Sequence, residues 1–239
     1  MLSLDTSGKI LFSSVIRFLE LNKILSRNTS QVPPKKILSY NMDVLLLQSK
    51  YTTMGLDMYL SKRSYVKNWS FMDKTERHSI TVKKGGKKRV GIDPKRVSYI
   101  IEEVGYWRKF NALHGWFVRE LADGVDNCQE IYVSTEDFKR LHEVLLKVQK
   151  TLNKARKVEK VLKDWNDKEY TVSAYECGDE LADLGFVPTE GFFFGGQEID
   201  DYFKNDVDET VDVIGKILIE IELERGLGLA SDYYYRASW

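Results

Sequence analysis

Arg108, Asn111 and His114 recur at intervals of three residues in the segment GYWRKFNALHGWF. An arginine guanidinium can hold a phosphate or carboxylate through two parallel hydrogen bonds. A histidine can donate, accept or transfer a proton near neutral pH. On a helix these three side chains follow a shallow spiral and form a candidate anion site. The alternative is that Arg108 is solvated and His114 packs in the core, because aromatic stripes like the one beside them are usually core.

Aromatic residues near this segment and at the end of the chain supply rings that can stack on a ligand. In the terminal SDYYYRASW, period-two alternation places Tyr234 and Arg236 on the face opposite Tyr233 and Tyr235. One of these faces should enter the core, and the other is available to a ligand or partner. The complete predicted ligand site is Trp107, Arg108, Asn111, His114, Tyr234 and Trp239.

Catalytic and metal-binding patterns are scarce in this chain. His78, His114 and His142 are scattered, and neither they nor the two cysteines share a ligand spacing. Neither a phosphate-binding P-loop nor a G-x-S-x-G motif occurs. We therefore assign no catalytic residue, no metal and no cofactor. An enzymatic alternative uses His114 as acid or base, with a metal ion supported by acids that precede the last helix: Glu198, Asp200 or Asp201.

The formal net charge is zero, but the charges are unevenly distributed. The stretch from Lys62 to Arg96 contains twelve Lys or Arg and three acids, whereas the stretch from Glu176 to Glu224 contains fifteen acids and two lysines. Zero net charge gives no general attraction to nucleic acid or anionic membrane. A solvated basic ribbon is one reading of the first section. Local nucleic-acid contact is the other, with Tyr65 and Trp69 beside four lysines: Lys83, Lys84, Lys87 and Lys88.

The elements before residue 122 are predicted from periodicity and turn residues. Residues 56–60 alternate like a strand. Residues 79–92 predict a hairpin around Gly85-Gly86, and a three-residue loop ending at Lys87 pairs Val82 with Val90, keeping apolar residues on one face. Pro94 suits the first turn of a helix, and apolar spacing extends that helix to residue 121.

The second half of the chain predicts a short strand at 129–133 and then a long helix. Ser134 and Asp137 form a capping-box signature, and a stripe from Phe138 to Trp165 predicts an extended helical arm over 134–165. GFFFGG at 191–196 suggests a buried strand, a last helix starts near Asp206, and 231–239 forms an aromatic strand. These elements predict an α+β domain with a mostly antiparallel small sheet, about three helices, a basic hairpin and the arm.

Residues 1–53 differ from the rest of the chain, and Met54 opens a segment that reads like a protein beginning. We predict a globular domain over 54–239. Residues 1–53 are either sequence upstream of the true start or a loosely docked extension. Two widely spaced cysteines fit a reducing compartment, and no apolar run is long enough to span a bilayer, so we expect a cytoplasmic protein.

Four blocks of sequence, in order, resemble a family of uncharacterised bacteriophage and prophage proteins. They are MGLDMYL at 54–60, YWRK-x-N-x-x-H-x-WF at 106–117, GFFFG at 191–195 and YYYRASW at the end of the chain. The resemblance covers about 54–239, and it carries no established activity. It implies the cytoplasm of a bacterial host and a role in host takeover or counter-defence.

Three functions remain in contention on the sequence alone. The first is a non-enzymatic binding module for an anionic or nucleotide-like ligand at the Arg108–His114 segment. The second is a nucleotide-directed hydrolase or transferase that uses His114. The third is a protein-interaction module, or an oligomer, that uses the 134–165 helix. The absence of a recognised catalytic constellation favours the first and third.

Overall fold

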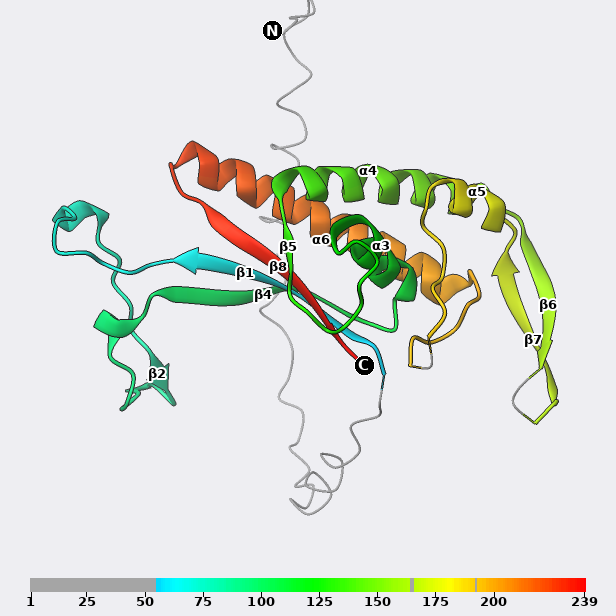
Figure 1. Cartoon of the computed structure of the whole chain (residues 1–239), viewed down its shortest axis with the longest axis horizontal. Coiled ribbons are helices and arrows are strands. Elements are labelled where there is room, and N and C mark those ends of the chain that lie inside the picture. Colours follow the sequence, from blue (N-terminus) through cyan, green and yellow to red (C-terminus); the bar gives the residue numbers. More distant parts are fainter. Residues whose placement is uncertain (1–54, 164–165, 192) are drawn as a thin grey trace, which may run out of the picture. The chain divides into compact units, whose positions relative to one another are not determined.

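Strand β1 (Asp57–Tyr65) is one of the two inner strands of a four-stranded antiparallel sheet in the computed structural model (Figure 1). The strand order is β4-β1-β8-β5, with β4 at Tyr99–Arg108, β8 at Ser231–Ser238 and β5 at Ile131–Val133. The structure describes residues 55–163, 166–191 and 193–239. The predicted extension 1–53 and Met54 lie outside these residues. With the helices below, the sheet confirms the predicted α+β class.

The two faces of this sheet differ in what covers them. Met58 and Leu60 of β1 and Tyr235 of β8 are buried, whereas their neighbours Tyr59 and Tyr234 point to the other side. The predicted alternation of the terminal strand is therefore confirmed. The register between β1 and β4 shifts after Leu60, where β4 carries one extra residue. One face of the sheet thus enters the core, and none of the described helices covers the other, which we call the helix-free face.

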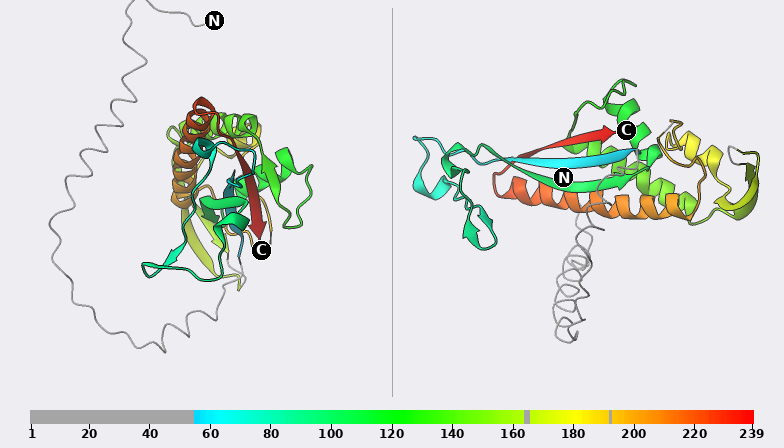
Figure 2. Two further views of the ribbon diagram at one scale, coloured as in Figure 1. Left: turned by 90° about the vertical axis from the view of Figure 1, so that its left-hand side faces the viewer. Right: turned by 90° about the horizontal axis from the view of Figure 1, so that it is seen from below.

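Four helices occur in the described residues, and each of them except the short α5 contributes several buried residues to the core (Figures 1 and 2). They are α3 (Asn111–Leu121), α4 (Thr135–Leu152), α5 (Gly178–Asp183) and α6 (Asp201–Gly226). Helices α4 and α6 pack along each other. The last helix begins five residues before the predicted start at Asp206, because Asp200 caps it by accepting a hydrogen bond from the amide of Phe203.

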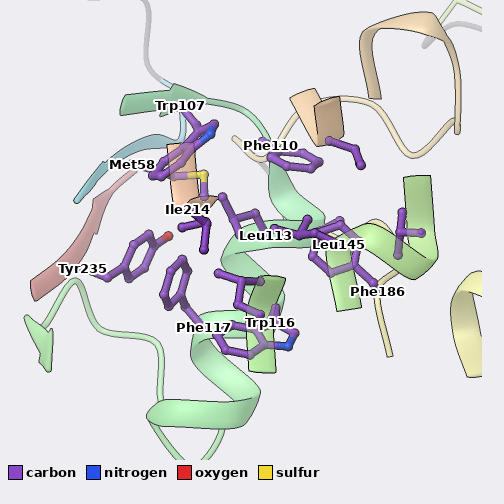
Figure 3. Close-up of a cluster of buried hydrophobic side chains, with 14 of the residues drawn as sticks. Met58, Trp107, Phe110, Leu113, Trp116, Phe117, Leu145, Phe186, Ile214 and Tyr235 are labelled. Atoms are coloured by element: carbon purple, nitrogen blue, oxygen red, sulfur yellow. The ribbon is translucent and has the colours of Figure 1, made fainter. Parts of the chain in front are cut away.

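The core joins α3 to the terminal strand through aromatic contacts (Figure 3). Phe117 stacks on Tyr235 with ring centroids 3.9 Å apart. Phe110 meets Phe186 edge to face at 5.9 Å, which ties the start of α3 to the segment after α5. Such pairs add about 0.5–1.5 kcal/mol each beyond the burial of their area. They fix α3, and hence the residues at its start, against the sheet.

The helix predicted over 94–121 is wrong in its first half. Residues Pro94–Arg96 form a single 3₁₀ turn, η2, and the next element is strand β4. Ile100, Ile101 and Val104 are β-branched and suit a strand, and β1 offers the pairing partner along the whole length of β4. Lys109 then takes a positive φ of 62°, which separates the strand from α3.

The predicted arm over 134–165 is also wrong beyond Leu152. The capping box is confirmed, since Ser134 accepts from the amide of Asp137 and the Asp137 carboxylate accepts from the amide of Ser134. The helix ends after its buried stripe, which lies in the core and does not form a free arm. The chain continues as a hairpin of β6 (Lys157–Lys163) and β7 (Glu169–Tyr175), where cross-strand pairing replaces the helical pattern.

The basic hairpin forms with a different register from the predicted one. Strand β2 (Lys83–Lys84) pairs with β3 (Lys87–Lys88) across the two-residue loop Gly85-Gly86. Both glycines take positive φ, 58° and 78°, which the tight primed turn requires. Both strands are exposed, so no buried face selects the alternative register.

Gly191 and residues 193–196, the described part of the segment predicted as a buried strand, form an irregular loop and no strand. Its backbone meets the start of β1, where the Leu56 amide donates to the carbonyl of Phe193 at 3.1 Å. The strands predicted at 56–60, 129–133 and 231–239 are confirmed as β1, β5 and β8, although β1 runs five residues further. Among the described residues, no helix is long and apolar enough to cross a membrane.

Candidate functional site

A cavity of about 500 Å³ opens where the end of β4 meets the start of α6. Arg108 and Lys109 line one side, and Gly195 and Gly196 of the irregular loop close another. The β6–β7 hairpin and the first turns of α6 complete the wall. This volume lies within the range of about 300–1,000 Å³ typical of small-molecule pockets. The cavity therefore brings together chain segments that are far apart in sequence.

Lys109 has an unusual backbone and an unengaged side chain. Its φ of 62° is held by the hydrogen bond from its amide to the carbonyl of Leu56 at 2.8 Å. Its side chain is exposed and makes no hydrogen bond or ion pair with any described residue. Arg108 is 40% exposed and lies 3.6 Å from the carboxylate of Asp57. Two adjacent cations are thus presented at the cavity, one of them with no carboxylate partner in the described chain.

Asn111 positions the loop that closes the cavity. Its side chain is buried, and its Nδ2 donates to the carbonyl of Phe194 at 3.2 Å and to that of Gly196 at 2.9 Å. Its Oδ1 accepts from the amide of Thr189 at 3.3 Å. Three hydrogen bonds use most of the capacity of an amide side chain. Asn111 therefore acts by holding the wall, and its amide is largely unavailable to a ligand.

Three carboxylates, Glu198, Asp200 and Asp206, also line the cavity. Asp200 caps α6, and Glu198 is paired with Lys160 at 3.0 Å. Burial, together with the carboxylates of Glu209 and Asp200, raises the pKa of Asp206 to about 6. The lining of the cavity thus combines two cations with three carboxylates, and the pKa of one of these carboxylates is raised.

Replacing Asp206 with asparagine is expected to stabilise the protein at neutral pH. The pKa of Asp206 is raised from 3.8 to about 6, so the folded state binds the proton more tightly and the free energy of unfolding falls as pH rises from about 4 to about 6. After discounting for the partial exposure of this side chain, we expect Asp206→Asn to gain about 1 kcal/mol at pH 7.5 and almost nothing at pH 4. Urea unfolding at both pH values measures this difference. The exposed Asp212→Asn on the same helix is the control, and an equal gain there contradicts the explanation.

His114 lies in the core and does not line the cavity. Its Nδ1 is 2.7 Å from the hydroxyl of Tyr235, and its Nε2 is 2.9 Å from a carboxylate oxygen of Asp126. The Asp126 carboxylate accepts from Nε2–H, and the hydrogen bond between Nδ1 and the Tyr235 hydroxyl occupies the other ring nitrogen. Burial raises the pKa of Tyr235 well above its usual value, so that hydroxyl keeps its proton. Both ring nitrogens are therefore occupied in joining α3 to the last strand and to the loop after α3.

The three aromatic residues predicted to stack on the ligand are dispersed. Trp107 is buried in the core, and Tyr234 lies on the helix-free face under the guanidinium of Arg63 at 4.1 Å. Trp239 is 39% exposed, with its ring 6.2 Å from that of His114. Of the predicted site, the structure brings only Arg108 and Asn111 to the cavity.

The site predicted from the sequence lacks three residues that line the cavity, which are Lys109, Asp206 and Tyr170. Lys109 adjoins Arg108, and the pair of neighbouring cations is the signal that could have found it. Tyr170 belongs to β7, and the sequence predicts no element over residues 169–175 that could place this ring. From the sequence alone, Asp206 is recognised only as an acidic residue near the N-terminus of the last helix.

The acids considered for a metal ion are engaged elsewhere. Asp201 accepts from Lys157 and from the hydroxyl of Tyr175, both at 2.8 Å, while Glu198 and Asp200 make the ion pair and the cap described above. Within residues 55–239, as far as they are described, no group of three or more His, Cys, Asp or Glu is arranged to hold a metal ion.

Comparisons with known proteins return no match among protein-family models, curated proteins or solved structures. The resemblance to phage proteins therefore stays a prediction. The function of the chain has to be inferred from the cavity and the surfaces around it.

Proposed function

We propose that this protein is a binding module for a small anionic, nucleotide-like ligand, held in the cavity at the junction of β4 and α6. The observation that carries this proposal is Lys109. It presents an ammonium group without a carboxylate partner in the described chain, beside Arg108 at the cavity. Adjacent arginine and lysine side chains suit a phosphate, which accepts several charge-assisted hydrogen bonds at once.

The backbone at Lys109 supports a ligand-binding role. A non-glycine residue at positive φ is disfavoured by roughly 1 kcal/mol or more, and such residues cluster at functional sites. Gly195 approaches Lys109 so closely that a Cβ there would lie 3.0 Å from the Cβ of Lys109. The loop held by Asn111 therefore fixes the direction in which Lys109 leaves the backbone.

The carboxylates that line the cavity narrow the class of ligand that can bind there. Carboxylates repel a simple anion but accept hydrogen bonds from amino groups. Asp200 and Asp206 therefore favour a ligand that has N–H donors as well as an anionic group. A nucleotide has both, and the half-exposed ring of Tyr170 in the cavity wall can stack on its base. This composition favours a nucleotide-like ligand over inorganic phosphate.

Binding without turnover is the mode that the geometry favours. His114, the residue considered for acid–base chemistry, is buried with both ring nitrogens engaged. A phage origin, implied by the four sequence blocks, adds a context in which the module sequesters or senses a host nucleotide during takeover or counter-defence.

Isothermal titration with AMP, ATP and inorganic phosphate tests this proposal. Lys109→Met keeps the aliphatic stem and removes the charge, and Lys150→Met on the exposed face of α4 is the matched control. We expect at least one nucleotide to bind the wild-type protein, to bind Lys109→Met about tenfold or more weakly, and to be recovered unchanged. Absence of binding by all probes, or equal affinity in both variants, contradicts the proposal. Consumption of the nucleotide contradicts its non-enzymatic part.

A further inference from the structure

Six tyrosines lie on the helix-free face of the sheet, among charged neighbours that include Glu103, Asp232 and Arg236. Strand register places the following tyrosines at alternate positions on this one face, opposite the buried Met58, Leu60 and Tyr235: Tyr59, Tyr65, Tyr99, Tyr106, Tyr132 and Tyr234. Five of them have exposures between 37% and 55%, which is high for large side chains in a sheet. Single exposed aromatics are ordinary on a protein surface, whereas several on one face of a sheet are a feature of interaction sites.

The rings on this face form pairs across neighbouring strands. Tyr59 and Tyr106 have centroids 5.3 Å apart, and Tyr65 and Tyr99 have centroids 5.1 Å apart. The hydroxyl of Tyr106 donates to Asp57 at 2.6 Å, which fixes that ring. Along β1, Tyr65 follows Tyr59 by six positions, a distance of about 20 Å at the rise of a strand. The pairs are spread over a length greater than that of a small ligand, which suits an extended chain.

A strongly basic segment adjoins one end of this face. Residues 66–98, which connect β1 to β4, contain ten Lys or Arg and three acids. Among the described residues, only one of these cations, Arg96, forms an ion pair with a carboxylate, that of Asp93. In both Figure 1 and Figure 2 the segment extends from the end of β1, at the opposite end of the domain from the β6–β7 hairpin. Its charges are therefore available to a partner.

Aromatic rings continue from the sheet into this basic segment. The indole N–H of Trp69 donates to the hydroxyl of Tyr65 at 3.0 Å. The ammonium of Lys67 lies 4.4 Å from the ring centroid of Trp69. Phe71 lies nearly parallel to Trp69 and is 82% exposed. Basic side chains interleaved with exposed rings are the combination that binds single-stranded nucleic acid, because rings stack on bases and cations follow phosphates.

We propose that the helix-free face and residues 66–98 together bind single-stranded nucleic acid, with bases stacked on the tyrosines and phosphates held by the lysines of the β2–β3 hairpin. Bases in a duplex are stacked on one another, so only a single strand presents them to these rings. A single strand uses both features at once, because its phosphates pair with the lysines while its bases stack on the rings. This surface extends beyond the cavity, and the proposal does not depend on the cavity ligand.

Fluorescence anisotropy with the full chain tests the electrostatic part. The probes are labelled 15-nucleotide oligothymidylate and oligouridylate and a duplex of the same length. We expect the single strands to bind more tightly than the duplex. Replacing Lys83, Lys84, Lys87 and Lys88 with alanine should reduce the slope of log affinity against log salt by up to about 3, at roughly 0.7 per lost phosphate contact. A quadruple alanine variant of Lys147, Lys150, Lys154 and Lys216, which are exposed elsewhere, should leave the slope unchanged.

Substitution of Tyr59 tests the stacking part. Tyr59→Ala is expected to weaken single-strand binding about tenfold, whereas Tyr59→Phe keeps the ring and the affinity. Thermal unfolding of each variant verifies that the fold is intact. The proposal is overturned by absence of single-strand binding at low salt, by duplex binding of equal strength, or by equal effects of Tyr59→Ala and Tyr59→Phe. Binding to phosphatidylserine vesicles but not to the oligonucleotides would assign the surface to a membrane and also overturn it.

Discussion

Replacing His114 with alanine is expected to lower the free energy of unfolding by about 3–5 kcal/mol and to leave the affinity of the cavity for its ligand nearly unchanged. The imidazole is buried and packs edge to face on Phe194 at 5.0 Å, so its removal leaves a void in the core. It also removes the partner of the Tyr235 hydroxyl and that of Asp126. Large-to-small changes in a core and orphaned buried polar groups together account for this magnitude.

Two tyrosine variants isolate the hydrogen-bonded part of this effect. Tyr235→Phe removes the hydroxyl bonded to His114 and should cost about 1–2 kcal/mol. Tyr233 is the matched control, since its hydroxyl is buried with no hydrogen-bond partner in the described structure. Tyr233→Phe should therefore be neutral or slightly stabilising. Urea unfolding gives the stabilities and nucleotide titration the affinities. A stable His114→Ala protein that has lost its ligand would show that the histidine belongs to the site after all.

Gly195→Ala is expected to lower the free energy of unfolding by about 2–3 kcal/mol and to weaken ligand binding. Gly195 has a φ of 94°, which a residue with a side chain rarely adopts. The added Cβ would also lie 3.0 Å from the Cβ and 3.3 Å from the carbonyl oxygen of Lys109. Backbone strain and this contact act on the residue that we propose holds the anion.

Gly196→Ala is the control for this substitution. A Cβ added at this next glycine would have no heavy atom within 4 Å, and its φ is not positive, so alanine fits there. We expect it to change stability by less than about 0.5 kcal/mol. Thermal unfolding gives the stability of both variants, and titration gives their affinity for the ligand, so that two adjacent positions of one loop are compared. Equal behaviour of the two variants would contradict the role given to the contact between Gly195 and Lys109.

The elements that can be predicted from sequence are those whose signals are local. The capping box at Ser134, the period-two pattern of the last strand and the apolar stripe of α6 each depend on residues within a few positions of one another. Residues 97–108 resemble a helix in sequence because Val97, Ile100, Val104 and Trp107 also match helical spacing. Pairing with β1, some 40 residues away, decides in favour of the strand. Local pattern alone carries no information about that partner.

The same limit applies to the site. Arg108 and Asn111 can be identified from their chemistry, but the cavity also needs β7 and the start of α6, which only the tertiary structure brings to Lys109. His114 shows the converse. Its residue type suggests reactivity, and only the positions of Tyr235 and Asp126 show that both nitrogens are already used.

Mass spectrometry of small molecules retained by the purified protein tests the central claim most directly, which is that the cavity beside Lys109 holds an anionic, nucleotide-like ligand. The wild-type protein is exposed to bacterial extracts, repurified and denatured, and the released molecules are compared with those from Lys109→Met. We predict that the wild-type protein releases an anionic, nucleotide-like molecule and that Lys109→Met releases much less. A wild-type protein that retains nothing from several extracts, or equal retention by both proteins, would contradict the claim.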